Sequence, residues 1–102
     1  MITLEFSQVI LYRFDKNNPQ EVIVPKEKIY RIESVGIGGT NGTVFLRLDE
    51  KIKIAILFSS VGNTDYSSVL PYWLPSEFKG NLYIDTDQTA SVSIVEYSVI
   101  NG

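Results

Sequence analysis

Apolar residues recur at every second position along most of this sequence, which is the period of a β-strand with one buried face. In the segment 43–48, for example, Val44, Leu46 and Leu48 occupy alternate positions. No segment shows a sustained apolar period of 3.6 residues between capping residues, so no helix is expected. The pattern therefore predicts an all-β chain.

The first segment, residues 2–14, has an apolar set on each face. The alternation places one set toward a core: Ile2, Leu4, Phe6, Ile10, Tyr12 and Phe14. Val9 and Leu11 fall on the opposite face, so the second half of this strand is expected to be covered on both sides.

The segments 43–48 and 51–58 form the clearest hairpin, turned at Asp49-Glu50. The alternation in the second segment points Ile52, Ile54, Ile56 and Phe58 toward the core. By the same rule Phe45 and Leu57 point outward, and their adjacent strands should bring them together on the outer face.

Turn signals separate seven or eight strands at spacings typical of a sandwich. The segments 38–42 and 85–89 are expected to be hairpin turns, and 59–68 a polar loop. A change of phase near Glu33-Ser34 predicts a β-bulge. We therefore expect one domain over residues 1–102, an antiparallel β-sandwich of jelly-roll type.

Composition narrows the classes of partner. The chain has 102 residues, 44% of them hydrophobic, and a net charge of −3. An acidic balance does not suit a nucleic-acid-binding protein, which needs a basic surface to displace counterions. No apolar run approaches the roughly 18 residues of a membrane helix, and no signal peptide is visible. Neither a nucleic acid nor a membrane is an expected partner.

The sequence contains no histidine and no cysteine. This removes Ser-His and Cys-His nucleophilic catalysis and the usual zinc ligand sets. The acidic residues fall mostly at turns or at outward strand positions. We expect no enzymatic activity, no catalytic residue, no cofactor and no metal site.

Two motifs resemble phosphate chemistry and are interpreted as turns. The segment 82–89 matches the strand-then-DxDxT pattern of haloacid-dehalogenase-like phosphotransferases, with acids at Asp85 and Asp87. That chemistry needs a parallel α/β sheet, and no helix is expected after this strand. The glycine-rich segment 36–39 likewise precedes no helix N-terminus that could hold a phosphate.

The segment Pro71-Tyr72-Trp73-Leu74-Pro75 is the most unusual local feature. Its flanking prolines favour an extended, stiff backbone. Tyr72 and Trp73 combine a large apolar area with a polar tip, which suits binding sites. Three roles remain open for it: a plug of the core, an oligomer contact or a ligand platform.

The stretch from Tyr30 to Tyr97 resembles the small β-sandwich virion proteins of tailed bacteriophages, which include head-decoration, head-fibre and tail or baseplate accessory proteins. The resemblance is carried by residues 32–35, the glycine-rich reversal, the 71–75 and 80–84 segments and the closing strand 92–97. It implies a structural role and symmetric self-assembly, and no catalytic residue.

The leading hypothesis is a structural assembly protein of a phage particle. It would form a homo-oligomer or dock onto other virion proteins in a lattice, and would be found in the virion and, during assembly, in the host cytoplasm. The expected interface residues are Phe45, Leu57, Tyr72 and Trp73, and Val9 and Leu11 are further apolar residues left over after one core is filled.

Two alternatives belong to other classes. One is a carbohydrate- or receptor-binding module that stacks a glycan on Tyr66, Tyr72, Trp73 or Tyr83. The other is a small inhibitor that binds one host protein through an acidic surface. Salt separates the inhibitor from the assembly protein, because electrostatically steered binding weakens with salt and apolar association does not.

Overall fold

The computed structural model describes residues 2–39, 41–49, 52–61, 64–66, 69–76 and 82–101. These residues form strands and connections and no helix. The strands are β1 (Ile2–Asp15), β2 (Gln20–Glu21), β3 (Lys28–Ile37), β4 (Gly42–Leu48), β5 (Ile52–Val61), β6 (Thr64–Tyr66), β7 (Tyr72–Pro75), β8 (Leu82–Thr86) and β9 (Thr89–Asn101). Seven of them have four or more residues, and β2 and β6 are shorter.

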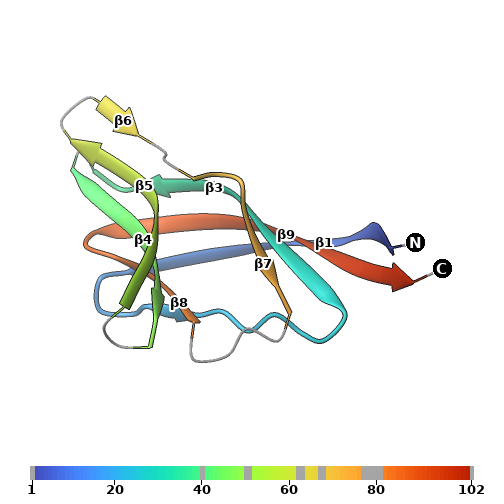
Figure 1. The fold of residues 1–102 in the computed structure, drawn as a ribbon. Coiled ribbons are helices and arrows are strands. Elements are labelled where there is room, and N and C mark those ends of the chain that lie inside the picture. Colours follow the sequence, from blue (N-terminus) through green and yellow to red (C-terminus); the bar gives the residue numbers. More distant parts are fainter. Residues whose placement is uncertain are drawn as a thin grey trace.

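Two antiparallel sheets pack face to face, which confirms the predicted all-β sandwich. Sheet A has the strand order β1-β9-β3-β7, and sheet B has the order β2-β8-β4-β5-β6. The pairs are nested: β1 with β9, β2 with β8, β3 with β7 and β4 with β5. In Figure 1 the β1 and β9 ribbons run side by side, and both chain ends lie at the same end of the molecule.

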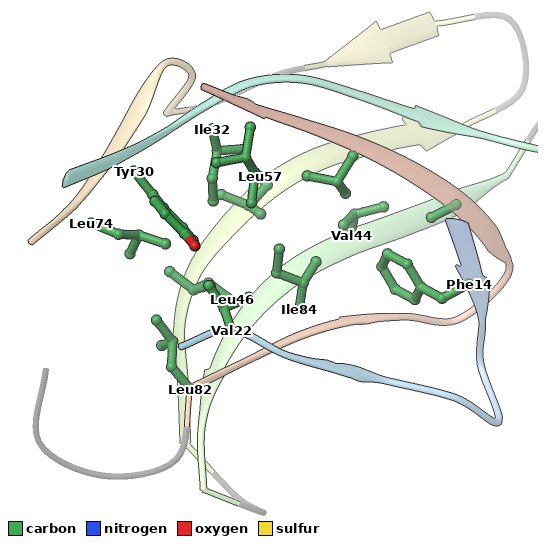
Figure 2. Close-up of a cluster of buried hydrophobic side chains, with 13 residues drawn as sticks. Phe14, Val22, Tyr30, Ile32, Val44, Leu46, Leu57, Leu74, Leu82 and Ile84 are labelled. Carbon is green, nitrogen blue, oxygen red and sulfur yellow. The ribbon is translucent and has the colours of Figure 1, made fainter. Parts of the chain in front are cut away.

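The core lies between the sheets and contains the residues that alternation placed inward on the central strands. Ile32, Val44, Leu46, Ile84 and Ile94 have no exposed surface. Figure 2 shows side chains from both sheets converging on this space, with Phe14 at one end and Leu74 and Leu82 at the other. Burial of such aliphatic side chains is the main favourable term in the stability of a sandwich.

The prediction that Ile2, Leu4 and Phe6 share the core face of β1 is wrong. The register between β1 and β9 shifts between Phe6 and Gln8, so Ser7 is the extra residue of a β-bulge. A bulge changes the phase of a strand. Residues from Ile10 onward keep their inward set, whereas the three apolar residues before the bulge lie on the outer face and are exposed.

The inward set predicted for β5 is wrong at Ile52, Ile54 and Ile56, whereas Phe58 packs against the core as predicted. Two register shifts separate β4 from β5, between Val44 and Phe45 and between Leu46 and Arg47. Ile52, Ile54 and Ile56 are exposed as a result, and Leu57 is completely buried. The predicted bulge near Glu33-Ser34 is confirmed, because the register of β3 against β9 shifts between Ile32 and Ser34.

The two segments expected to be hairpin turns connect different sheets. The glycine-rich reversal joins β3 in sheet A to β4 in sheet B, and Asp87-Gln88 joins β8 in sheet B to β9 in sheet A. Alternation and turn composition do not distinguish a hairpin from such a crossover. The β4–β5 hairpin is confirmed. The segment predicted as a polar loop after Phe58 contains the end of β5 and the short strand β6.

Candidate functional site

The outer face of sheet A is apolar along β1 from Ile2 to Leu11. Its outward side chains are 39% to 68% exposed, and from residue 2 to residue 11 they are Ile2, Leu4, Phe6, Val9 and Leu11. The register shows that these side chains share one face of the sheet. Phe6 lies opposite Tyr97 and Val9 lies opposite Val95. Because Glu96, between these two partners on β9, is buried, both partners point outward.

The same apolar surface continues across the other strands of sheet A. Val95 lies beside Arg31, which lies beside Trp73, and Tyr97 lies beside Ile29. Trp73 is 45% exposed. We call the outward apolar side chains of sheet A the apolar face. It comprises the five β1 residues with Val95, Tyr97, Val99, Ile29 and Trp73. A sheet with apolar residues on both faces is typical of one that is covered on both sides.

Arg31 organises the end of the apolar face next to β7. Its guanidinium carbon lies 5.1 Å from the ring centroid of Trp73 and 5.2 Å from that of Tyr97. The two rings are stacked, with centroids 5.8 Å apart and planes at 30°. Arg31 also forms an ion pair with Glu33, the bulge residue of β3. These contacts fix the orientation of Trp73 before any partner binds.

The outer face of sheet B mixes charged and apolar side chains, and Ile56, which is 46% exposed, lies opposite Phe45 on it. Arg47 Nε lies 3.2 Å from Asp85 Oδ2, and its guanidinium carbon lies 4.6 Å from the ring centroid of Tyr83. Lys53 Nζ lies 4.4 Å from the ring centroid of Phe45. Cations thus lie over two aromatic rings of this face, as Arg31 does on sheet A, and this face is less uniformly apolar than the β1 side of sheet A.

The buried carboxylate of Glu96 holds the bulge that gives β1 its apolar outer face. Glu96 is 4% exposed and accepts a hydrogen bond from Gln8 Nε2 at 3.3 Å, with Lys28 Nζ at 3.9 Å. The hydroxyls of Ser7 and Tyr30 also bond to it. Burial raises the pKa of Glu96, but these hydrogen bonds and Lys28 outweigh burial and leave the pKa below its ordinary value. Burial and Glu96 raise the pKa of Tyr30 to about 12.

The structure separates the four predicted interface residues. Trp73 belongs to the apolar face, whereas Phe45 lies on the outer face of sheet B beneath Lys53. Leu57 is in the core, so the prediction that it lies beside Phe45 on the surface is wrong. Tyr72 packs partly buried against the core. Val9 and Leu11, the leftover apolar residues of the first segment, are on the apolar face.

Alternation alone could not find the rest of the apolar face. Ile2, Leu4 and Phe6 have the same parity as the core residues after the bulge, and only the pairing with β9 shows that they point outward. The sequence contains only one weak sign of this bulge: Gln8 interrupts the apolar series at the point where the phase changes.

The aromatic residues considered for glycan stacking do not form one platform. Trp73 is on sheet A, and Tyr83 is on sheet B under Arg47. The side chain of Tyr66 lies outside the described residues. Trp73 has a stacked neighbour in Tyr97, which the sequence analysis did not select.

The carboxylates of the DxDxT-like segment make structural hydrogen bonds. Asp85 pairs with Arg47, and its Oδ1 accepts the backbone N–H of Thr86 at 2.8 Å. Asp87 Oδ1 accepts the backbone N–H of Thr43 at 2.8 Å and so ties the crossover to β4. The strand before them belongs to an antiparallel sheet, which does not provide the parallel α/β setting of a phosphotransferase.

The described residues were also searched for metal sites, membrane spans and hollows. Within the described ranges there is no group of three or more acidic, histidine or cysteine residues that could hold a metal ion. A search of the same residues found no helix that could span a membrane. Two open hollows of about 260 Å³ flank the β8–β9 crossover, and the first is lined mainly by Arg13, Ile37 and Ala90.

Comparisons of the chain with models of protein families, with curated proteins and with solved structures found no match. The fold and the apolar face are therefore the observations from which a function can be argued.

Proposed function

We propose that this chain is a non-enzymatic structural protein that acts by association through the apolar face of sheet A. The observation that carries the proposal is the contrast between its two outer faces. On sheet A, β1 presents five exposed apolar side chains in one row, whereas sheet B mixes the exposed Ile56 with Arg47 and Lys53, whose cations lie over the rings of Tyr83 and Phe45. Exposed apolar patches of more than a few hundred Å² on soluble proteins mark interaction sites.

The size of sheet A suits such a role. Its four strands contain 14, 13, 10 and 4 residues. At about 3.4 Å per residue and about 4.8 Å between strands, they cover roughly 670 Å² in projection. A standard protein interface buries about 800 Å² of accessible surface on each partner, and accessible surface exceeds its flat projection. One face of this sheet is thus large enough for a stable contact.

Two further considerations favour a virion component, such as a capsid-decoration, head-fibre or tail accessory protein. The nested pairing of the strands is what a jelly roll requires, in which a long hairpin is folded over on itself, and jelly rolls are frequent in viral capsids. The resemblance of residues 30–97 to small phage accessory proteins points to the same setting. The partners in this proposal are further copies of the chain or other virion proteins.

Quantitative mass analysis of the native particle tests the proposal. We expect the chain at a fixed, symmetric copy number per particle. Val9→Glu with Leu11→Lys should lose incorporation, because it places charges in the contact. Phe45→Glu with Ile56→Lys, which makes the matched change on sheet B, should retain it. A particle that lacks the chain, or that incorporates both variants equally, would overturn the proposal.

A glycan- or receptor-binding module is the second candidate, and the Trp73–Tyr97 stack favours it. An exposed indole supported by a second ring and by Arg31 is a surface on which a sugar ring can stack. Binding on a glycan array that Trp73→Ala abolishes, and Phe45→Ala does not, would select this function over assembly.

A further inference from the structure

The four edges of the two sheets differ greatly in length. Among the described strands, the edges of sheet B are β2 and β6, with two and three residues. One edge of sheet A is β7, with four residues ending at Pro75. The other edge is β1, with 14 residues. Native proteins keep exposed edges short or interrupted because an unpaired strand edge is a template for another strand.

β1 is only partly protected as an edge strand, by the charged Glu5 and Arg13 and by the bulge at Ser7. It contains no proline, and the five outward side chains from Ile2 to Leu11 are apolar. At about 3.4 Å per residue it spans roughly 48 Å, which matches the longest dimension of the molecule, 48 Å. The bulge at Ser7 lies in the pairing with β9, and among the described strands none pairs with the other edge of β1.

We infer that β1 pairs antiparallel with β1 of a second copy of this chain, which joins the two A sheets into one continuous sheet of eight strands. The two-fold axis passes through the Ser7-Gln8 bulge. A two-fold contact of this kind uses the same strand on both subunits. This inference rests on the proposed function and names a second copy of the chain as one partner. The pairing sets the two apolar faces side by side on one side of the joined sheet, where they stay open to a further partner.

The bulge selects the register of the pair. It divides the outward residues of β1 into one group before Ser7 and one group after Gln8. An antiparallel register in which residue numbers sum to 15 sets bulge against bulge and keeps the outward side chains of both copies on one face. Leu4 then lies opposite Leu11, and Phe6 lies opposite Val9. A shift of two residues in either direction sets an outward side chain against an inward one near the axis.

The charges of β1 are compatible with this register. Glu5 of one copy lies opposite Ile10 of the other, and Arg13 lies opposite Ile2, so no like charges face each other. A pair of 14-residue antiparallel strands forms on the order of a dozen backbone hydrogen bonds. A typical protein interface has about ten direct hydrogen bonds. The backbone hydrogen bonds between the two β1 strands therefore already reach the number found in a typical interface.

Cysteine pairing tests the register, and the native chain contributes no background because it contains no cysteine. Leu4→Cys and Leu11→Cys are prepared as separate proteins and oxidised alone and as a mixture. Facing residues in an antiparallel pair lie about 4.5–5.5 Å apart between Cα atoms, which is within the range of a disulfide. We expect a crosslinked dimer in the mixture and at most a trace in either protein alone. Equal crosslinking in all three samples, or none in the mixture, would overturn the register.

A charge pair provides a second test in solution that does not depend on oxidation. In the double variant Leu4→Lys with Leu11→Lys, a lysine of one copy faces a lysine of the other at two symmetric places. In Leu4→Lys with Leu11→Glu, a lysine faces a glutamate at both places, and the loss of apolar surface is the same. Light scattering should show monomers for the first variant and dimers for the second. The same mass for both would refute the pairing.

The failure of this inference is distinguishable from the failure of the proposed function. If the wild-type protein is monomeric but Val9→Glu with Leu11→Lys still loses incorporation into the native particle, the apolar face binds another protein. The β1 pairing is then wrong, and the structural role stands. If incorporation is also unaffected, both are wrong.

Discussion

Gln8 Nε2 on the edge strand donates a hydrogen bond of 3.3 Å to Oε1 of Glu96, a carboxylate buried within sheet A. The contact joins residues 88 positions apart and lies at the bulge where β1 changes phase. Because the phase change turns Ile2, Leu4 and Phe6 outward, a single buried acid supports the surface on which the proposed function depends.

Replacement of Glu96 should destabilise the fold. Glu96→Ala leaves the donors of Ser7, Gln8 and Tyr30 without their acceptor and removes the ion pair with Lys28, and we expect a loss of about 3 kcal/mol in the free energy of unfolding. Urea denaturation measures this change. Glu5→Ala, an exposed glutamate on the neighbouring strand β1, is the control and should change stability by less than about 0.5 kcal/mol. Equal effects of the two substitutions would show that Glu96 does not hold the bulge.

The lowered pKa of Glu96 predicts a dependence of stability on pH. A carboxyl with a lower pKa in the folded state stabilises the fold above its unfolded pKa, here close to 4.5. That contribution is lost as the pH falls below 4.5 and through the folded pKa. Melting temperatures of the wild type and of Glu96→Gln should therefore converge in acid and diverge toward neutral pH. Parallel curves would contradict the assigned hydrogen bonds.

Neighbouring residues of β5 should respond very differently to truncation. Leu57 is fully buried and Ile56 is 46% exposed. Leu57→Ala should cost about 3 kcal/mol because it leaves a cavity in the core, whereas Ile56→Ala should cost less than about 1 kcal/mol. Thermal or urea unfolding of the two variants measures the difference. A larger loss of stability for Ile56→Ala than for Leu57→Ala would mean that Ile56 faces the core, as simple alternation predicts.

The turn between β4 and β5 makes a prediction about backbone conformation. Asp49 has a φ of 55°, in the left-handed region that glycine, asparagine and aspartate tolerate best. Asp49→Gly should leave stability nearly unchanged, and Asp49→Val should reduce it by about 1–2 kcal/mol. A valine variant as stable as the glycine variant would place the turn in another conformation.

Sequence reasoning predicted the fold class and most of the central core, because alternation is unbroken where Val44, Leu46 and Leu48 face the other sheet. It located the bulge at Glu33-Ser34 because two apolar pairs of opposite phase flank it. It failed for Leu57, where the extra residue is hidden in an unbroken apolar run and only the pairing with β4 reveals it.

The candidate site was less predictable than the core. Val9, Leu11 and Trp73 could be selected as apolar residues in excess of one core. The role of Glu96 could not, because its partners come from β1 and β3, far away in sequence. Leu57 also cannot be used to test the surface, because a lysine at this buried position would unfold the chain.

Sedimentation velocity over a wide range of protein concentration tests most directly whether sheet A carries the association. The wild type and the sheet B variant Phe45→Glu with Ile56→Lys should sediment as the same oligomer. The apolar-face variant Val9→Glu with Leu11→Lys, which also leaves the net charge unchanged, should sediment as a folded monomer. An oligomer that survives the sheet A change and is lost with the sheet B change would contradict the central claim, and a wild type that remains monomeric at every concentration would overturn the β1 pairing.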